Sequence, residues 1–338
     1  MHTLRGALDR LGKNAEKGLQ HALPVRPASL RELIRVATLP EPRLVDLEPD
    51  DPAAFESFEV EDPQGIAYGG GDLWFLSSQS TVQLCTIEGD DPFRPTGVRR
   101  GSGRTLGELL KEAGLSAPPQ IPVVYDHIGD LGYSDPLLYV PIRRTDDGPN
   151  LIMGLSRDLR VVGWAELSGT TGESTCAINP WNGLLYLPRR DDTGRVEAYT
   201  VTAFLERFGR SSQWGRRLEL QPVSTADIQL LTPEGAHDGE GMQGLAFSAN
   251  GRIYVTRSGS GPYINRTFVY NLLTGQRFGA ERIWNFPGQG DEIEGIAVHP
   301  AGVLYVSVND NDAEFTPFSQ DDFDLYTFRY RTLAASEV

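Results

Sequence analysis

A short hairpin phrase that recurs five times constrains the fold of this 338-residue chain more than any other feature. Each copy holds a polar residue, two or three apolar residues, a turn of two to four residues, and a second strand centred on an aromatic residue. The turns are rich in Gly, Asn, Asp and Ser, which suit the backbone angles of tight hairpins. The copies occupy residues 64–78, 129–143, 174–190, 243–258 and 294–308.

One fixed position in each copy, which we call the repeat origin, measures the period of the repeat. The origins are Gly65, Asp130, Thr175, Gly244 and Gly295, spaced 65, 45, 69 and 51 residues apart. Each of the two long intervals contains a segment that predicts a helix: 105–114, which opens with a capping box and ends at a glycine, and 203–208. Further strands are expected at 81–87, 160–167, 195–201, 266–271 and 324–331.

Hairpin units that repeat every 45–50 residues or so are typical of a β-propeller, whose blades are four-stranded sheets around a channel. The sequence therefore predicts an all-β fold, a β-propeller of five or six four-stranded blades with a short N-terminal helical extension. A sixth blade would lie within 100–126 or 212–240. A strand from 43–60 is expected to complete the blade that holds 324–331. The expected domains are the extension 1–42, the propeller 43–332 and a tail 333–338.

The N-terminal extension differs from the rest of the chain in pattern and charge. Leu4, Leu8, Leu11, Ala15 and Leu19 form one apolar stripe of a predicted helix. The first 40 residues carry seven Lys and Arg against three acids, whereas the whole chain has a formal net charge of −15. This helix either packs on the propeller or docks on a partner, and the pattern fits both.

Charge and cysteine usage exclude several classes of function. The acidic balance argues against a nucleic-acid partner, which needs a basic face. No apolar run approaches the 18 or so residues of a membrane span. The two cysteines lie 91 residues apart and are expected to be small buried residues. With no apolar segment of the secretory type, these features predict a cytoplasmic protein whose partner is a small-molecule ligand or another protein.

The phrase Pro63-Gln64-Gly65-Ile66-Ala67 and the hairpins NGRIYV and AGVLYV resemble the NHL and SMP-30/gluconolactonase-like propeller superfamily. The resemblance covers roughly residues 60–310. It implies that these phrases mark the two inner strands of each blade, and that the residue before each inner strand lies at the top mouth of the channel. Because the superfamily includes lactonases, phosphotriesterases, condensing enzymes and binding platforms, the resemblance implies a fold and leaves the activity open.

The mouth position, carried over copy by copy, is held by Gln64, Gly129, Ser174, Gln243 and Glu294. Acids lie just upstream of several copies, and oxygen-rich rings suit Ca²⁺ or another divalent cation. The expected metal ligands are Glu240, Glu292 and Glu294, and the expected ligand-binding residues are Gln64, Glu173 and Gln243. Alternatively, these groups cap strand ends and bind channel water. Lactonase-like members carry Asp, Asn and Glu in such rings, so the Gln and Gly found here disfavour a lactonase site.

Two histidines near repeat origins are candidate catalytic bases. His127 is flanked by Asp126 and Asp130, and His237 is flanked by Asp238 and Glu240. A histidine pKa of about 6.5 suits proton transfer near neutrality. The alternative for each is an oriented, hydrogen-bonded loop histidine. A third, His299, falls in a hairpin turn and is expected to be solvated.

Two functions from different classes follow from these patterns. The first is a β-propeller binding protein that uses the polar, acidic top mouth of its channel for a small ligand, a cation or a partner. The alternative is a divalent-cation-dependent propeller hydrolase, acting on a lactone, ester or phosphoester at the same mouth. The chain lacks a recognisable catalytic triad, which favours the binding protein.

Overall fold

The computed structural model describes a defined part of the chain, and every structural statement below refers to that part. The described residues are 43–44, 63–89, 97–115, 125–145, 148–167, 175–189, 193–207, 214–239, 241–249, 251–257, 266–278, 292–300, 303–309 and 323–331. No helix among them is long and apolar enough to cross a membrane. The expected N-terminal helix and the tail 333–338 lie outside them.

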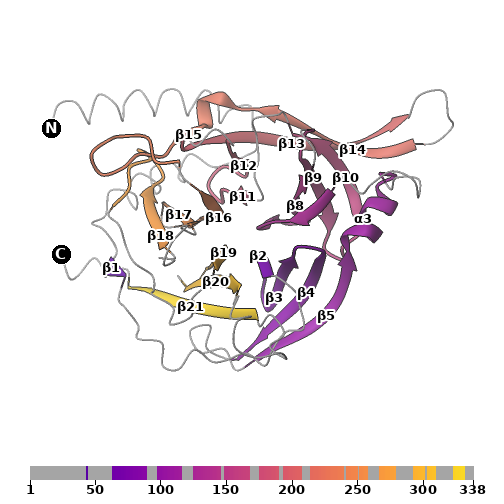
Figure 1. Ribbon diagram of the computed structural model, residues 1–338, viewed down its shortest axis with the longest axis horizontal. Helices are drawn as coiled ribbons and strands as arrows, with labels where there is room; N and C mark the ends of the chain where they lie inside the picture. Colours follow the sequence, from indigo (N-terminus) through magenta and orange to yellow (C-terminus); the bar gives the residue numbers. More distant parts are fainter. Residues whose placement is uncertain are drawn as a thin grey trace.

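Antiparallel strands arranged around a common centre make up most of the described chain (Figure 1). We number their groups in chain order. Group 1 contains β2 (Pro63–Gly70), β3 (Leu73–Ser78), β4 (Thr81–Glu88) and β5 (Gly97–Thr105). Group 2 contains β6 (Tyr125–Ile128), β7 (Gly132–Ser134), β8 (Leu137–Arg144), β9 (Leu151–Ser156) and β10 (Val161–Glu166).

The other three groups lie further along the chain. Group 3 contains β11 (Ala177–Ile178), β12 (Leu185–Pro188), β13 (Arg195–Arg207), β14 (Trp214–Pro222) and β15 (Ile228–Gln229). Group 4 contains β16 (Met242–Phe247), β17 (Arg252–Arg257) and β18 (Arg266–Asn271). Group 5 contains β19 (Glu292–His299), β20 (Val303–Asn309), β21 (Phe323–Arg331) and β1 (Arg43–Leu44). The all-β prediction is confirmed.

Group 5 joins the two ends of the described chain. Its strand order is β1-β21-β20-β19, and β1 pairs antiparallel with β21 through Arg43 opposite Arg331 and Leu44 opposite Tyr330. The expected pairing of an early strand with 324–331 is therefore present. Such pairing between the ends removes an exposed sheet edge.

The segments that were candidates for a sixth blade contribute to other elements wherever they are described. In 100–126 the described residues belong to β5, to helix α3 (Leu106–Glu112) with its C-terminal turn, and to the start of β6. In 212–240 they belong to β14, the 3₁₀ turn η1 (Ser224–Ala226), β15 and the loop after it. Within the described residues, strand pairing gives four sheets: groups 1, 4 and 5 are separate sheets, and groups 2 and 3 form one ten-stranded sheet because β14 pairs with β10.

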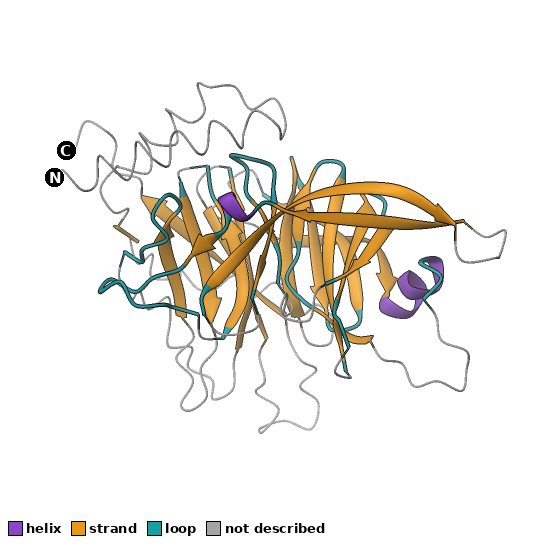
Figure 2. Cartoon of the chain, turned by 90° about the horizontal axis from the view of Figure 1, so that it is seen from above, coloured by secondary structure: helices purple, strands orange, loops and turns teal. Residues whose placement is uncertain are grey.

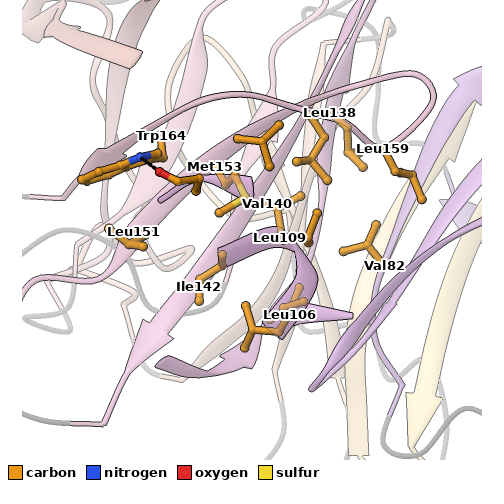
Figure 3. Close-up of a cluster of buried hydrophobic side chains, with 14 of the residues drawn as sticks. Val82, Leu106, Leu109, Leu138, Val140, Ile142, Leu151, Met153, Leu159 and Trp164 are labelled. Carbon is orange, nitrogen blue, oxygen red and sulfur yellow. Dashed lines mark hydrogen bonds between the residues drawn. The ribbon is translucent and has the colours of Figure 1, made fainter. Parts of the chain in front are cut away.

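Helix α3 forms where its capping box predicts it. The Thr105 side chain accepts the Glu108 main-chain N–H, and the Glu108 carboxylate accepts the Thr105 N–H at 2.9 Å. The helix ends before Gly114, whose φ of 74° closes the last turn. Its apolar face enters a core shared by groups 1 and 2, part of which is drawn in Figure 3: Val82, Leu106, Leu109, Leu138, Val140, Ile142, Leu151, Met153, Leu159 and Trp164.

The helix predicted at 203–208 is wrong, because residues 203–207 belong to strand β13. They pair antiparallel with β14, with Ala203 opposite Leu218 and Phe204 opposite Arg217. The long hairpin reaches beyond the ring, as Figure 2 shows, and β14 touches β10 through Trp164 opposite Arg217. The Arg217 guanidinium lies 3.5 Å from the Trp164 ring centroid. Pairing of 203–207 with β14 outweighs a weak local helix preference.

Neighbouring groups pack by matching a large residue against a small one. The residue after each origin is large or is Cys176, and the second residue after each origin is Ala or Gly. Each interface between groups combines one of each kind: Ile66 with Ala297, Leu131 with Ala67, Cys176 with Gly132, Leu245 with Ala177, and Ile296 with Ala246. Both cysteines are free and buried, as predicted.

Candidate functional site

The carboxylate of Asp130 lies where the innermost strands of the groups converge. Its Oδ1 accepts the main-chain N–H groups of Ile66 at 3.1 Å and Leu131 at 2.9 Å. Its Oδ2 accepts those of Leu245 at 3.2 Å and Ile296 at 3.4 Å. All four donors are the residue that follows a repeat origin, so one fully buried side chain satisfies the inner edges of four groups.

Glycine at three of the five origins permits the inner strands to lie close to Asp130 and to one another. A Cβ on Gly295 would lie 2.6 Å from Gly65 Cα and 2.7 Å from Asp130 Oδ1. A Cβ on Gly244 would lie 2.5 Å from Thr256 Oγ1. Complete burial raises the pKa of Asp130 well above its usual range, and the four N–H donors act against that rise.

A pocket of about 580 Å³ begins beside Asp130 and is lined by inner-strand residues of all five groups. Its walls form three layers that follow the repeat. The first-layer residues are Ile66, Leu131, Leu245 and Ile296; the second-layer residues are Ala67, Gly132, Ala177, Ala246 and Ala297; the third-layer residues are Tyr68, Tyr133, Ile178, Phe247 and Val298. The small second layer leaves the space that the larger third layer surrounds.

His299 lines this pocket next to the third layer and lies in an aromatic cluster. Its ring centroid is 4.9 Å from that of Tyr68 and 6.2 Å from that of Trp74, which it stacks on at 18°. Burial lowers the pKa of His299 from its usual value. The expectation of a solvated turn histidine is correct only in part, because His299 ends β19 and is partly buried against the Tyr68 and Trp74 rings.

The pocket and the predicted mouth lie on different sides of Asp130. The inner strands run from the origin towards the third layer, so the pocket is on the side where these strands end. Gln64, Gln243 and Glu294 precede the origins on the same strands and so lie on the side where the strands begin. Successive strand residues advance by about 3.3 Å, which separates these positions from the third layer by about 13 Å along the strand.

The structure describes some of the predicted mouth residues. Gln64 and Glu294 are buried, with 5% and 6% of their surfaces exposed, and Gln243 is partly buried. The main-chain carbonyl of Glu294 accepts a hydrogen bond from Thr256 Oγ1 at 3.0 Å. These positions therefore lie inside the ring rather than on an open surface.

The expected metal ligands and one ligand-binding residue are described only in part. Glu173 and Glu240 lie outside the described residues, and for Glu292 only the main chain, opposite Asn309, is described. Among the described residues, no group of three or more His, Cys, Asp or Glu side chains could hold a metal ion. The calcium site formed by Glu240, Glu292 and Glu294 stays a prediction.

His127 lies on β6, opposite Arg143 on β8, and is partly buried. Burial and, to a smaller extent, the Arg143 cation lower its pKa to about 4, and Asp126 acts in the opposite direction. Arg143 Nη2 lies 3.5 Å from Asp126 Oδ2. An imidazole with this pKa is neutral but weakly basic at pH 7, which makes it a poor general base.

His237 is exposed, and its neighbour Asp238 is engaged elsewhere. Asp238 Oδ1 lies 2.7 Å from Arg257 Nη1, and its Oδ2 lies 2.9 Å from Arg277 Nη1. The Tyr270 hydroxyl donates to the same carboxylate at 3.0 Å. Asp238 is therefore bound by two guanidinium groups rather than by His237. Glu240, the other carboxylate expected beside His237, lies outside the described residues.

Comparison with solved structures found distant similarities. A GH43 β-xylosidase/α-arabinofuranosidase from a compost microbial metagenome is 9% identical, with a TM-score of 0.49, over 83% of this chain and 94% of that one. An aldose sugar dehydrogenase from Streptomyces coelicolor, solved with PQQ bound, is 14% identical, with a TM-score of 0.41, over 80% and 95%. A gluconolactonase from Xanthomonas campestris is 13% identical, with a TM-score of 0.37, over 81% and 78%.

No protein family and no curated protein matched the sequence. The identities and TM-scores of the three structures are too low to transfer an activity, a ligand or a cofactor to this chain. The site must be interpreted from its own residues.

Sequence reasoning missed the pocket although the repeat contained its signal. The small second-layer residues and the large third-layer residues stand at the same offsets in all five copies. The predicted mouth residues lie upstream of the origins, whereas the space opens downstream of them. The role of Asp130 had no local signal, because three of its four donors lie 64 to 166 residues away.

Proposed function

We propose that this chain is a β-propeller binding protein that holds a small ligand in the pocket at the centre of its strand ring. One observation carries the proposal: a cavity of about 580 Å³ is lined by residues of all five groups, including the first-layer residues whose N–H groups bind Asp130. Binding sites for small molecules are concave, mostly apolar and within roughly 300–1,000 Å³.

Two features support binding at this place. The layers come from residues far apart in sequence, so the pocket exists only when the ring is assembled, and its walls are held by the packing between groups. The Asp130 carboxylate bonds to first-layer N–H groups on four of the inner strands, which fixes their spacing. A pre-formed cavity of this kind lowers the entropic cost of binding.

The experiment uses N-phenyl-1-naphthylamine, an uncharged probe whose fluorescence rises in apolar surroundings. We expect saturable binding of one probe per chain. The third-layer substitution Val298→Trp fills the pocket and should weaken probe binding by about tenfold or more. Val162→Trp is the matched control, since Val162 is also partly buried but lies on β10, away from the pocket lining.

Thermal unfolding of both variants checks that each is folded. Absence of probe binding to the wild-type chain would overturn the proposal. Equal weakening by the two substitutions would also contradict it, because the probe would then sense general destabilisation rather than the pocket. Weakening by Val298→Trp alone is the supporting result.

A further inference from the structure

Among the described residues that line the central pocket, no side chain is charged at neutral pH. None of its described residues is Asp, Glu, Lys or Arg, and the one titratable imidazole, His299, has a pKa lowered by burial. An ion moved into such a site loses its hydration without gaining a counter-charge, which costs several kcal/mol. The pocket therefore discriminates against charged ligands.

The third layer places aromatic rings around the space. Tyr68, Tyr133 and Phe247 come from three different groups, and Tyr133 packs on Phe75 with ring centroids 5.0 Å apart. Aromatic walls favour flat apolar molecules, because ring stacking and edge contacts add to the effect of burial. The small second-layer residues leave space for a ring system between the third layer and the first layer.

The Tyr68 hydroxyl can form a hydrogen bond with a ligand in the pocket. The Tyr68 ring is held by Trp74, with centroids 5.0 Å apart, and by His299, at 4.9 Å. Its hydroxyl makes no hydrogen bond with the described residues, whereas the Tyr133 hydroxyl already donates to Asp135 Oδ1 at 2.9 Å. Of the two tyrosines in the third layer, Tyr68 is thus the one whose hydroxyl remains for a ligand.

We infer that the ligand is an uncharged small molecule with a flat apolar body and a hydrogen-bonding group that meets the Tyr68 hydroxyl. This inference rests on the proposed function, since it concerns the same pocket. It goes further by excluding phosphates, carboxylates and metal ions from the site, and by assigning Tyr68 as a residue that determines specificity.

The charge of the ligand is tested with two probes that share one ring skeleton. N-phenyl-1-naphthylamine is uncharged, and 8-anilinonaphthalene-1-sulfonate adds a sulfonate. We expect the wild-type chain to bind the uncharged probe at least tenfold more tightly. If the sulfonate binds equally well and Val298→Trp blocks it, the pocket is real but the inferred ligand class is wrong. If neither probe binds, the proposed function itself fails.

The role of Tyr68 is tested by competition between 2-naphthol and naphthalene for the uncharged probe. We expect the wild-type chain to favour 2-naphthol about fivefold, the worth of one neutral hydrogen bond. Tyr68→Phe should abolish this preference, because the variant has no hydroxyl to meet that of 2-naphthol. Val162→Trp, which lies outside the pocket lining, is the control and should keep the preference. A preference that survives in Tyr68→Phe overturns the assignment of this hydroxyl.

Discussion

Asp130 Oδ2 accepts the main-chain N–H of Ile296, 166 residues further along the chain, at 3.4 Å. This contact joins group 2 to group 5 across the centre of the strand ring. The same carboxylate accepts N–H groups of groups 1 and 4. In an ordinary sheet a neighbouring strand would accept such N–H groups, whereas here the Asp130 side chain does so. The centre of the ring is therefore polar at the level of Asp130 and apolar on the side of the pocket.

Replacing Asp130 should destabilise the whole ring. In Asp130→Ala, four buried N–H groups lose their acceptor, and each unsatisfied group costs about 1–3 kcal/mol, so we expect a loss above about 4 kcal/mol. Asp130→Asn keeps one oxygen acceptor and should lose less. Urea unfolding measures both free energies, and a loss below about 1 kcal/mol for the alanine variant would contradict the central role of this residue.

The origin glycine at position 295 should not tolerate a side chain. Its added Cβ would lie 2.6 Å from Gly65 Cα, so Gly295→Ala is expected to lower the free energy of unfolding by about 1–3 kcal/mol. Gly107 on α3 has open space around its Cβ position and serves as the control. Gly107→Ala should stabilise the chain by about 0.5–1 kcal/mol. Equal effects of the two substitutions in chemical denaturation would refute the close packing at the origin.

His127 should make stability depend on pH. Its pKa in the folded chain is about 4, below the ordinary 6.5, so the unfolded chain takes up the proton first as the pH falls. The stabilisation of the folded chain by neutral His127 is complete above pH 6.5 and is lost progressively between pH 6.5 and 4. The facing charges are Arg143 and Asp126. Because His127 is partly exposed, we expect its share to be about 1 kcal/mol.

His127→Gln removes this titration. The denaturation midpoint of each protein is measured at pH 7.5 and at pH 4.5. The drop in midpoint between these two pH values should be smaller for the variant than for the wild type. Parallel pH profiles for the two proteins would show that the neutral state of His127 does not contribute to folding.

Calcium binding by Glu240, Glu292 and Glu294 predicts a shift of the melting temperature. For a site with a Kd of about 0.1 mM, 2 mM Ca²⁺ stabilises the folded chain by about 2 kcal/mol, and a chelator reverses the gain. Glu294→Gln should remove the shift and leave the chain folded. A wild-type melting curve that does not respond to Ca²⁺, Mg²⁺ or Mn²⁺ at millimolar concentration would rule out this site.

Local chemistry made several parts of the fold predictable. The hairpin at 64–78 forms because Gly70 and Gly71 adopt φ angles of 92° and 61°, which few other residues tolerate. Helix α3 forms because Thr105 and Glu108 cap each other. Where local preference was weak, as in 203–207, pairing with β14 decided the outcome. The pattern around His299 likewise gave no sign of the rings that cover it.

The sequence by itself determined the repeat, its strands and turns, and the small residue at the second position after each origin. These depend on periodicity and turn geometry within about 15 residues, which the chain displays directly. Only the tertiary structure decided that Asp130 occupies the centre, that the pocket opens downstream of the origins, and that Tyr68 lies against His299. Hydrogen bonding and packing between strands 64 or more residues apart exist only once the groups are assembled, so no local pattern could specify them.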